Sequence, residues 1–207
     1  MGRHPQSTDS KVLDRINQQP PGWVFSAADF RDLGTPVAVR LALMRQARKG
    51  GIRKVGRGLF DRPRQMARLG RVLPPLSENV VQAMQARDHS RVIPSGAHAA
   101  NLLGLSTQVP VRAVYLTDGR ARTVSLGQQQ IVFKHAATRQ MATAGRISGT
   151  VIQALRWLGR DHIDATTIAT LRRRLSDDDK KQLLQDLRYA PAWVAAIVQQ
   201  VAKPATL

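Results

Sequence analysis

The chain has 207 residues, with 32 Lys and Arg against 14 Asp and Glu, so its formal net charge is +18 at pH 7. Hydrophobic residues make up 43% of the sequence and cysteine is absent, which excludes global disorder, disulfides and thiolate metal sites. No apolar run reaches the roughly 20 residues of a membrane span, and the N-terminus lacks the apolar region of a signal peptide. We therefore expect a cytoplasmic protein that has no membrane partner and binds a polyanion.

Two short helices open the predicted fold. An apolar stripe predicts a helix over residues 10–18, which two prolines end. After a short apolar segment, Ser26 stands three residues before Asp29. A serine at the cap and an acid in the first turn favour the start of a helix, so we expect one over residues 27–32.

A second, longer helix follows the turn at Leu33-Gly34. Thr35 is a favourable N-cap residue, and Pro36 fits the first helical position, where its missing N–H would have no partner anyway. The helix is expected to run to Gly50-Gly51. Two helices joined by a short turn that contains glycine form the helix-turn-helix pattern.

Apolar residues occupy two opposite sides of this longer helix. The first side holds Val39, Ala42, Leu43 and Ala47. The second side holds Val37, Leu41 and Met44. Because arginines lie on or beside the second side, we expect it to face nucleic acid. The outward residues expected to contact DNA are Thr35, Arg40, Met44, Arg45 and Arg48. Arginine can hydrogen-bond guanine edges with both arms, and a capping threonine can hold a phosphate.

Residues 52–60 alternate apolar and basic side chains around Gly56-Arg57-Gly58, which predicts a two-stranded hairpin of the kind called a wing. Arg53, Lys54 and Arg57 are expected to hold the DNA backbone rather than to read its sequence. The surrounding segment carries eleven basic residues and a single acid, Asp61: Arg40, Arg45, Arg48, Lys49, Arg53, Lys54, Arg57, Arg62, Arg64, Arg68 and Arg71. A nearby phosphate backbone explains this block best, and a solvated basic face is the alternative.

The domain organisation follows from a proline-broken stretch after this block. We expect a winged helix-turn-helix domain over residues 1–75, a linker over 76–90 and a second domain over 91–207. In the second domain, strand-like runs at 111–117, 122–126 and 130–134 predict a three-stranded antiparallel meander. Helices are expected at 147–158, 166–175, 177–188 and 191–202. The predicted fold class is therefore α+β.

Sequence signals for catalysis or metal binding are weak. Asp161-His162-Ile163-Asp164 and Ser176-Asp177-Asp178-Asp179 could supply metal ligands, but both stand where helices begin, so we interpret them as caps. Neither His98 nor His135 has a serine or acid near it in the sequence in the arrangement of a nucleophile, so we interpret both as structural. We therefore expect no enzyme activity, no catalytic or metal-binding residues and no cofactor. Arg172-Arg173-Arg174 is interpreted as a solvated helix surface, with a second polyanion or an acidic partner as the alternative.

Two stretches resemble a known family. The hairpin GGIRKVGRGLFDRP and the central PSGAHAANLLGLSTQVPVRAVYLTDG are similar to the AbiEi-type antitoxins of type IV toxin–antitoxin systems. The resemblance covers residues 22 to about 135. It implies a bacterial abortive-infection regulator that binds inverted repeats upstream of its operon and represses it. It also implies a neighbouring nucleotidyltransferase-like toxin, which the second domain would counter with or without direct contact.

Three classes of function remain distinct at this stage. A DNA-binding autorepressor and antitoxin explains the basic block, the helix pair and the hairpin together. An RNA- or ribosome-associated basic protein explains the charge, but only 4% of the residues are aromatic, few for stacking single-stranded bases. An enzyme such as a nuclease would need clustered acids, and the acids here stand at helix starts and turns. We therefore expect double-stranded DNA to be the nucleic-acid partner.

Overall fold

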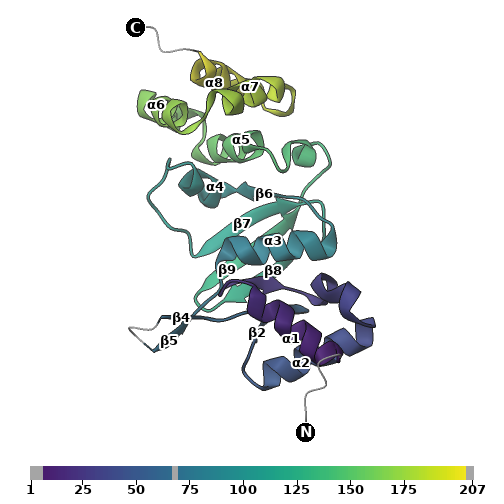
Figure 1. The fold of residues 1–207 in the computed structure, drawn as a ribbon. Helices are drawn as coiled ribbons and strands as arrows, with labels where there is room; N and C mark the ends of the chain where they lie inside the picture. Colours follow the sequence, from purple (N-terminus) through teal and green to yellow (C-terminus); the bar gives the residue numbers. More distant parts are fainter. Residues whose placement is uncertain (1–6, 67–69, 204–207) are drawn as a thin grey trace. The chain divides into compact units, whose positions relative to one another are not determined.

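The computed structural model describes residues 7–66 and 70–203, which form an α+β fold (Figure 1). The chain divides into two compact units. The first unit holds the described residues up to His89 together with Val124–Gln128, and the second holds the remainder. Among the described residues, no helix is long and apolar enough to cross a bilayer.

The helices of the first unit are α1 (Thr8–Gln18), the 3-10 helix η1 (Ala27–Leu33), α2 (Pro36–Arg48) and α3 (Ser77–Asp88). Of these, η1 and α2 begin at the predicted capping residues. Ser26 and Asp29 form a capping box at η1, where the Ser26 backbone N–H donates to Asp29 Oδ2 over 2.7 Å. Thr35 Oγ1 accepts a 3.3 Å hydrogen bond from the Ala38 N–H at the start of α2. Both helix starts expected from the sequence are confirmed.

Short antiparallel strands complete the first unit. A three-stranded sheet has the order β1-β3-β2, with β1 at Val24–Phe25, β2 at Arg53–Gly56 and β3 at Leu59–Asp61. The expected hairpin over residues 52–60 is confirmed. Its turn contains Gly58 at φ +70°, a conformation that glycine adopts without steric cost. A separate hairpin pairs β4 (Arg64–Met66) with β5 (Arg71–Leu73), and the sequence analysis did not anticipate it.

An aromatic and aliphatic core holds these elements together. Phe25 and Phe30 are fully buried with ring centroids 5.5 Å apart, and Trp23 stacks on Phe25 at 4.4 Å. The buried core cluster is made of Val12, Ile16, Phe25, Phe30, Val39, Ala42, Leu43, Ile52 and Phe60. Burial of apolar area on this scale is the main force that fixes α1 and α2 against the sheet.

The segment expected as a linker, residues 76–90, contains α3. Val80, Val81 and Met84 of this helix are buried. The side-chain amide of Asn79 donates a 2.9 Å hydrogen bond to the carbonyl of Gly22. The compact first unit therefore extends through α3 to His89.

A mixed four-stranded sheet has the order β6-β7-β9-β8, with β6, β7 and β9 in the second unit. These strands are β6 (Val92–Ser95), β7 (Arg112–Thr117), β8 (Arg122–Leu126) and β9 (Gln129–His135). β7 lies parallel to β9, with Ala113 opposite Ile131 and Tyr115 opposite Phe133. The strand positions agree with the sequence analysis, but the expected antiparallel meander is wrong, because β9 lies between β7 and β8.

Hydrogen bonds around Asp118 explain this topology. Both carboxylate oxygens of Asp118 accept from Arg91, from its backbone N–H at 2.7 Å and from Nε at 2.8 Å. The Gly119 carbonyl accepts from Nδ1 of His135, the last residue of β9, over 3.1 Å. Asp118-Gly119 therefore starts a connection that passes the end of β9, instead of forming the tight two-residue hairpin expected from its composition.

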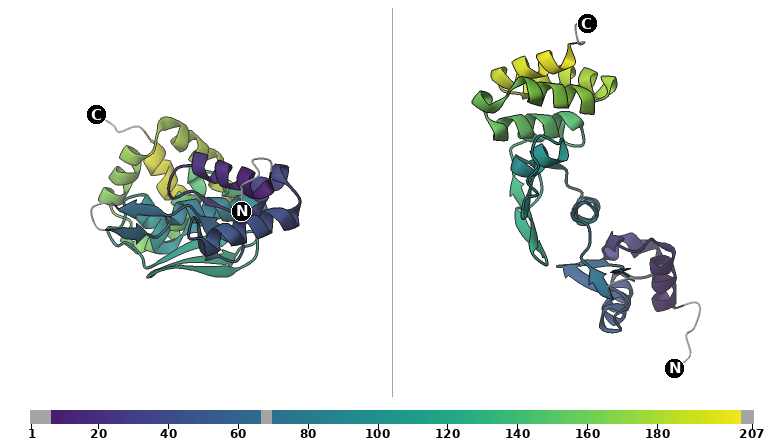
Figure 2. Two further views of the ribbon diagram at one scale, coloured as in Figure 1. Left: turned by 60° about the horizontal axis from the view of Figure 1, so that its bottom comes forward. Right: turned by 90° about the vertical axis from the view of Figure 1, so that its left-hand side faces the viewer.

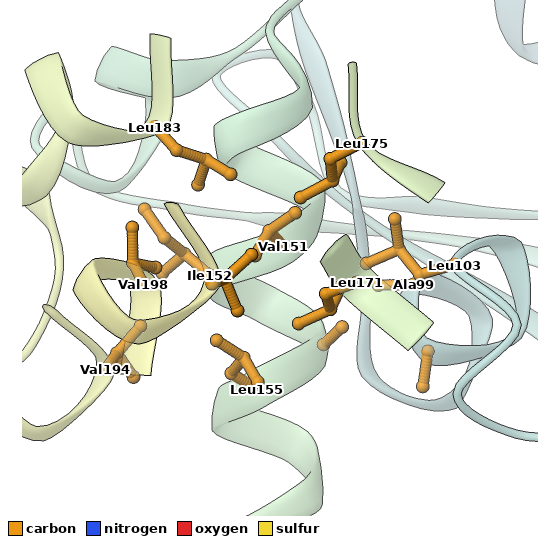
Figure 3. Close-up of a cluster of buried hydrophobic side chains, with 13 residues drawn as sticks. Ala99, Leu103, Val151, Ile152, Leu155, Leu171, Leu175, Leu183, Val194 and Val198 are labelled. Carbon is orange, nitrogen blue, oxygen red and sulfur yellow. The ribbon is translucent and has the colours of Figure 1, made fainter. Parts of the chain in front are cut away.

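The remaining helices stack in layers beside β6 at one edge of this sheet, which the right-hand view of Figure 2 shows in teal to yellow. They are α4 (Gly96–Leu102), η2 (Gln140–Thr143), α5 (Ile147–Leu158), η3 (Arg160–His162), α6 (Ala165–Arg174), α7 (Asp177–Gln185), η4 (Leu187–Tyr189) and α8 (Ala192–Ala202). Asp164 caps α6, and Ser176 with Asp179 forms a capping box at α7, as expected. Leucine and valine side chains from α5 to α8 meet in the core drawn in Figure 3.

Candidate nucleic-acid interface

The two apolar sides of α2 have opposite environments. Val39, Ala42 and Leu43 are fully buried in the core of the first unit. On the opposite side the large apolar side chains are exposed, with exposed fractions of 56% for Val37, 48% for Leu41 and 43% for Met44. The side that was expected to face outward is therefore the solvent-facing side of the helix, which is labelled in Figure 1.

Arginines lie on and beside this outward side. Arg48 follows Met44 at helical spacing and continues the apolar row, while Arg40 and Arg45 flank it. Arg40 and Arg48 are exposed, and within the described part of the chain no hydrogen bond or ion pair engages either side chain. Both guanidinium groups are thus available to a ligand.

Arg45 is partly engaged within the protein. Its Nε lies 3.3 Å from Asp9 Oδ1, and its side chain remains 55% exposed. The other oxygen of Asp9 accepts a 3.3 Å hydrogen bond from the side-chain amide of Gln46, a buried residue of α2. Asp9 therefore ties the first turn of α1 to α2 and helps to set which side of α2 faces solvent.

Arg53 has an internal position that the sequence analysis did not anticipate. Its Nε donates to Asp61 Oδ1 over 3.0 Å and its Nη2 to Asp61 Oδ2 over 2.6 Å. The same Nη2 also donates to the Leu73 carbonyl over 2.9 Å, and Asp61 is fully buried. The guanidinium expected to hold a phosphate instead joins β2, β3 and β5.

Arg62 and Arg64 also have internal partners. Arg62 Nη1 donates to the Asn17 carbonyl over 3.1 Å and to the Gln19 carbonyl, at the end of α1. A cation at this position stabilises the negative end of the helix dipole. Arg64 donates to the Pro74 carbonyl over 3.4 Å. These two arginines therefore hold chain segments together.

The tip of the β2–β3 hairpin carries exposed positive charge. Lys54 and Arg57 are both exposed. The Arg57 carbonyl accepts a 2.7 Å hydrogen bond from Arg87 Nη1, and Arg87 pairs with Asp88 over 2.7 Å. Arg87 on α3 thus braces the backbone of the hairpin tip. Sequence reasoning missed this role because the two arginines are 30 residues apart.

The basic block accordingly separates into two groups. Arg53, Arg62 and Arg64 bind groups of the protein itself. The exposed group consists of Arg40, Arg45, Arg48, Lys49, Lys54, Arg57 and Arg71. Arg68 lies outside the described residues. Thr35 is also exposed at the N-terminus of α2, where backbone N–H groups and the helix dipole favour an anion.

All residues of the candidate interface lie in the part of the sequence that matches a known protein family. Residues 11–183 match the family described as "Family of unknown function (DUF6088)". The chain belongs to this family. No curated protein matches the sequence. Among solved structures, the fold is similar to the crystal structure of the RV2827C protein from Mycobacterium tuberculosis. That chain is 15% identical with a TM-score of 0.46, over 96% of this chain and 78% of the other.

Outside the interface, the three arginines at residues 172–174 of this DUF6088 chain differ in their surroundings. Arg172 donates to the Gln200 carbonyl over 2.7 Å, and the guanidinium of Arg174 lies against Gly104. Arg173 is exposed. Within residues 7–66 and 70–203, no three His, Cys, Asp or Glu side chains gather as metal ligands.

Proposed function

We propose that the first unit is a winged helix-turn-helix domain that binds double-stranded DNA. In this proposal α2 is the recognition helix in the major groove, and the β2–β3 hairpin is the wing. The observation that carries the proposal is the outward side of α2. It presents Arg40, Arg45 and Arg48 around an exposed apolar row, and the helix contains no acidic residue.

The chemistry of duplex DNA fits this surface. The major groove is about 12 Å wide and admits an α-helix. Arg40 and Arg48, whose side chains are available, would hydrogen-bond base edges, and Met44 would contact bases between them. Arg45, half engaged with Asp9, would meet a phosphate, as would Thr35 at the helix N-terminus.

The hairpin supplies contacts that do not depend on sequence. Lys54 and Arg57 would lie along the sugar-phosphate backbone and set the position of α2 in the groove. Arg53 would contribute indirectly, because its ion pair with Asp61 holds the hairpin from which Lys54 and Arg57 project. Each phosphate neutralised releases counterions, so binding should weaken steeply with salt.

The resemblance to AbiEi-type antitoxins extends the proposal to a biological role. The protein would bind inverted repeats upstream of its own operon and repress it as part of a type IV toxin–antitoxin system. Its second unit would counter a nucleotidyltransferase-like toxin. Two copies on an inverted repeat satisfy this arrangement without a dimer in solution.

A competition experiment tests the nucleic-acid class. The full chain is bound to a fluorescent duplex from upstream of its own gene. Unlabelled duplex DNA, duplex RNA and single-stranded RNA of the same sequence are then added in turn. We expect duplex DNA to compete at least about tenfold better than either RNA, because a helix cannot enter the narrow major groove of A-form RNA. Stronger competition by RNA would replace DNA with RNA as the partner.

A growth experiment tests the antitoxin role. The neighbouring toxin gene is induced in cells that carry this protein or an empty vector. The proposal predicts growth only when the protein is present. Arrested growth in both cultures would contradict the antitoxin role and leave the DNA-binding proposal unaffected.

A further inference from the structure

The apolar row of α2 remains 43–56% exposed at Val37, Leu41 and Met44, whereas Val39, Ala42 and Leu43 on the other side of the helix are fully buried. Resting on the proposed function, we infer that Val37, Leu41 and Met44 form a base-reading strip that contacts the 5-methyl groups of thymine in the major groove. The DNA site would therefore contain consecutive A·T pairs opposite the strip.

The positive charge around the strip favours duplex DNA as the ligand that contacts it. Arg40 and Arg45 lie on either side of the row and Arg48 ends it, so any occupant must place negative charge around an apolar centre. The major groove has this arrangement where thymine occurs. Its walls are phosphates, and the C5-methyl is the apolar group that a base pair presents on its floor.

The dimensions of the strip agree with this reading. Val37, Leu41 and Met44 follow at intervals of four and three residues, so they share one side of the helix. At a rise of 1.5 Å per residue, the seven steps from Val37 to Met44 span about 10 Å. That length matches roughly three base-pair steps of 3.4 Å. Three side chains can therefore meet methyl groups on three or four successive pairs.

The strip also begins where a recognition helix meets bases first. Helix-turn-helix proteins place the N-terminal residues of the second helix against base edges. Val37 is the second residue of α2, and Leu41 lies one turn further along. The sequence analysis placed both residues outward but gave neither a role. Their exposure and their position among the arginines supply one.

Uracil tests the inference directly, because a dU·A pair differs from a T·A pair at the major-groove edge by the missing methyl group. Binding of the full chain is measured with four 24-base-pair duplexes: alternating d(AT), alternating d(AU), alternating d(GC), and d(GC) in which every cytosine is 5-methylcytosine. One methyl contact contributes about fourfold in affinity, so three contacts predict roughly sixtyfold tighter binding to d(AT) than to d(AU). The methylated d(GC) duplex should bind more tightly than d(GC), because its methyl groups occupy the same groove.

Two variants assign the effect to the strip. Leu41→Ala keeps a good helix former at an exposed position, so the fold is retained. We expect this variant to lose affinity for d(AT) and to discriminate d(AT) from d(AU) several-fold less than the wild type. Met44→Ala should behave in the same way. Leu184→Ala, at an equally exposed leucine on α7, is the matched control and should leave all four affinities unchanged.

The possible failures are distinguishable. Equal, salt-sensitive binding of the wild type to d(AT) and d(AU) would overturn methyl reading and leave DNA binding intact. If the wild type bound every duplex no more tightly than the Arg40→Ala variant does, the proposed function and this inference would both be overturned. Conversion of a wild-type dimer to a monomer by Leu41→Ala, observed by sedimentation, would assign the strip to a second copy of the chain instead.

Discussion

Individual arginines of the basic block differ in what they bind, although their charges are the same. Arg53 makes two hydrogen bonds to the fully buried Asp61, whereas Arg57 projects from the hairpin tip with its side chain exposed. A buried carboxylate without a partner is costly, and an exposed cation is not. The two residues should therefore affect different properties of the protein.

The first prediction contrasts these two arginines. Arg53→Ala should lower the free energy of unfolding of the first unit by about 1–3 kcal/mol, because it leaves Asp61 buried and unpaired. Arg57→Ala should leave the free energy of unfolding within about 0.5 kcal/mol of the wild type. It should also reduce the slope of log affinity against log salt by about one unit. Urea unfolding and DNA titrations measure the two effects. An unchanged salt slope for Arg57→Ala would remove the hairpin from the DNA.

The second prediction concerns the arginines of α2 that have no described partner. Arg40→Ala and Arg48→Ala should each weaken binding to the upstream duplex by about 1–3 kcal/mol and relax preference at one base position. Arg156→Ala, at an exposed arginine on α5, controls for the loss of one positive charge. Titrations against single-base variants of the duplex check this prediction. Normal binding by either α2 variant would mean that the outward side of α2 does not read bases.

At the scale of the elements, the connection after β7 is held by the ion pair between Asp118 and Arg91. The strength of this pair depends on pH, because Asp118 must be ionised. Burial disfavours the charge of Asp118, but hydrogen bonds and the positive charge from Arg91 outweigh burial and lower the pKa of Asp118 below its usual 3.8. A carboxyl group with a lowered pKa stabilises the fold above its usual pKa. That contribution is lost as the pH falls through the pKa in the folded state.

The third prediction follows from this sign. Asp118→Asn should be less stable than the wild type near pH 7. The difference should shrink as the pH falls from about 3.8 through the lower pKa of folded Asp118, where the wild-type carboxyl becomes protonated too. Urea midpoints over a pH series measure the difference, and Asp161→Asn controls for loss of an exposed aspartate. A difference that stays constant down to about pH 2 would contradict the role of the Asp118 charge.

Local patterns predicted the helices well and the sheet poorly. Ser26, Thr35 and Ser176 act on N–H groups within three residues, so their capping roles can be read from neighbours in the sequence. The boundaries of α5 match the expectation of 147–158. The order of β7, β8 and β9 depends instead on Arg91 and His135, which are distant in sequence from Asp118. Composition of the turn alone could not reveal those partners.

In the candidate site, too, the local features could be predicted from the sequence and the tertiary contacts could not. The outward side of α2 followed from helical periodicity and the position of Arg48, because a helix places its faces by local geometry. The ion pair of Arg53 with Asp61 did not follow, because it depends on the register of β2 against β3. Arg87, which braces the hairpin from α3, could not be assigned without the tertiary structure.

At the scale of the whole molecule, the two compact units have separate cores and contrasting features. The first unit carries the exposed part of the basic block and α2, while the second is built around the core of α5 to α8. α3 belongs to the first unit, so a fragment that is to keep it must extend to His89. A unit with its own core can in principle fold alone.

The fourth prediction uses this division. A fragment of residues 1–89 should bind the upstream duplex within about tenfold of the full chain, since the proposed base contacts all lie in it. The same fragment should fail to protect cells from the neighbouring toxin. Anisotropy and growth after toxin induction measure the two properties. Full protection by the fragment would show that the second unit has another role.

The most direct test of the account is fluorescence anisotropy of the purified full chain on the duplex from upstream of its own gene and on a shuffled duplex, across a salt series. The account predicts specific binding at least about a thousandfold tighter than binding to the shuffled duplex at physiological salt. It also predicts a steep loss of affinity as salt increases. Equal, weak binding to both duplexes at every salt concentration would contradict the account, because α2 would then be part of a non-specific basic surface.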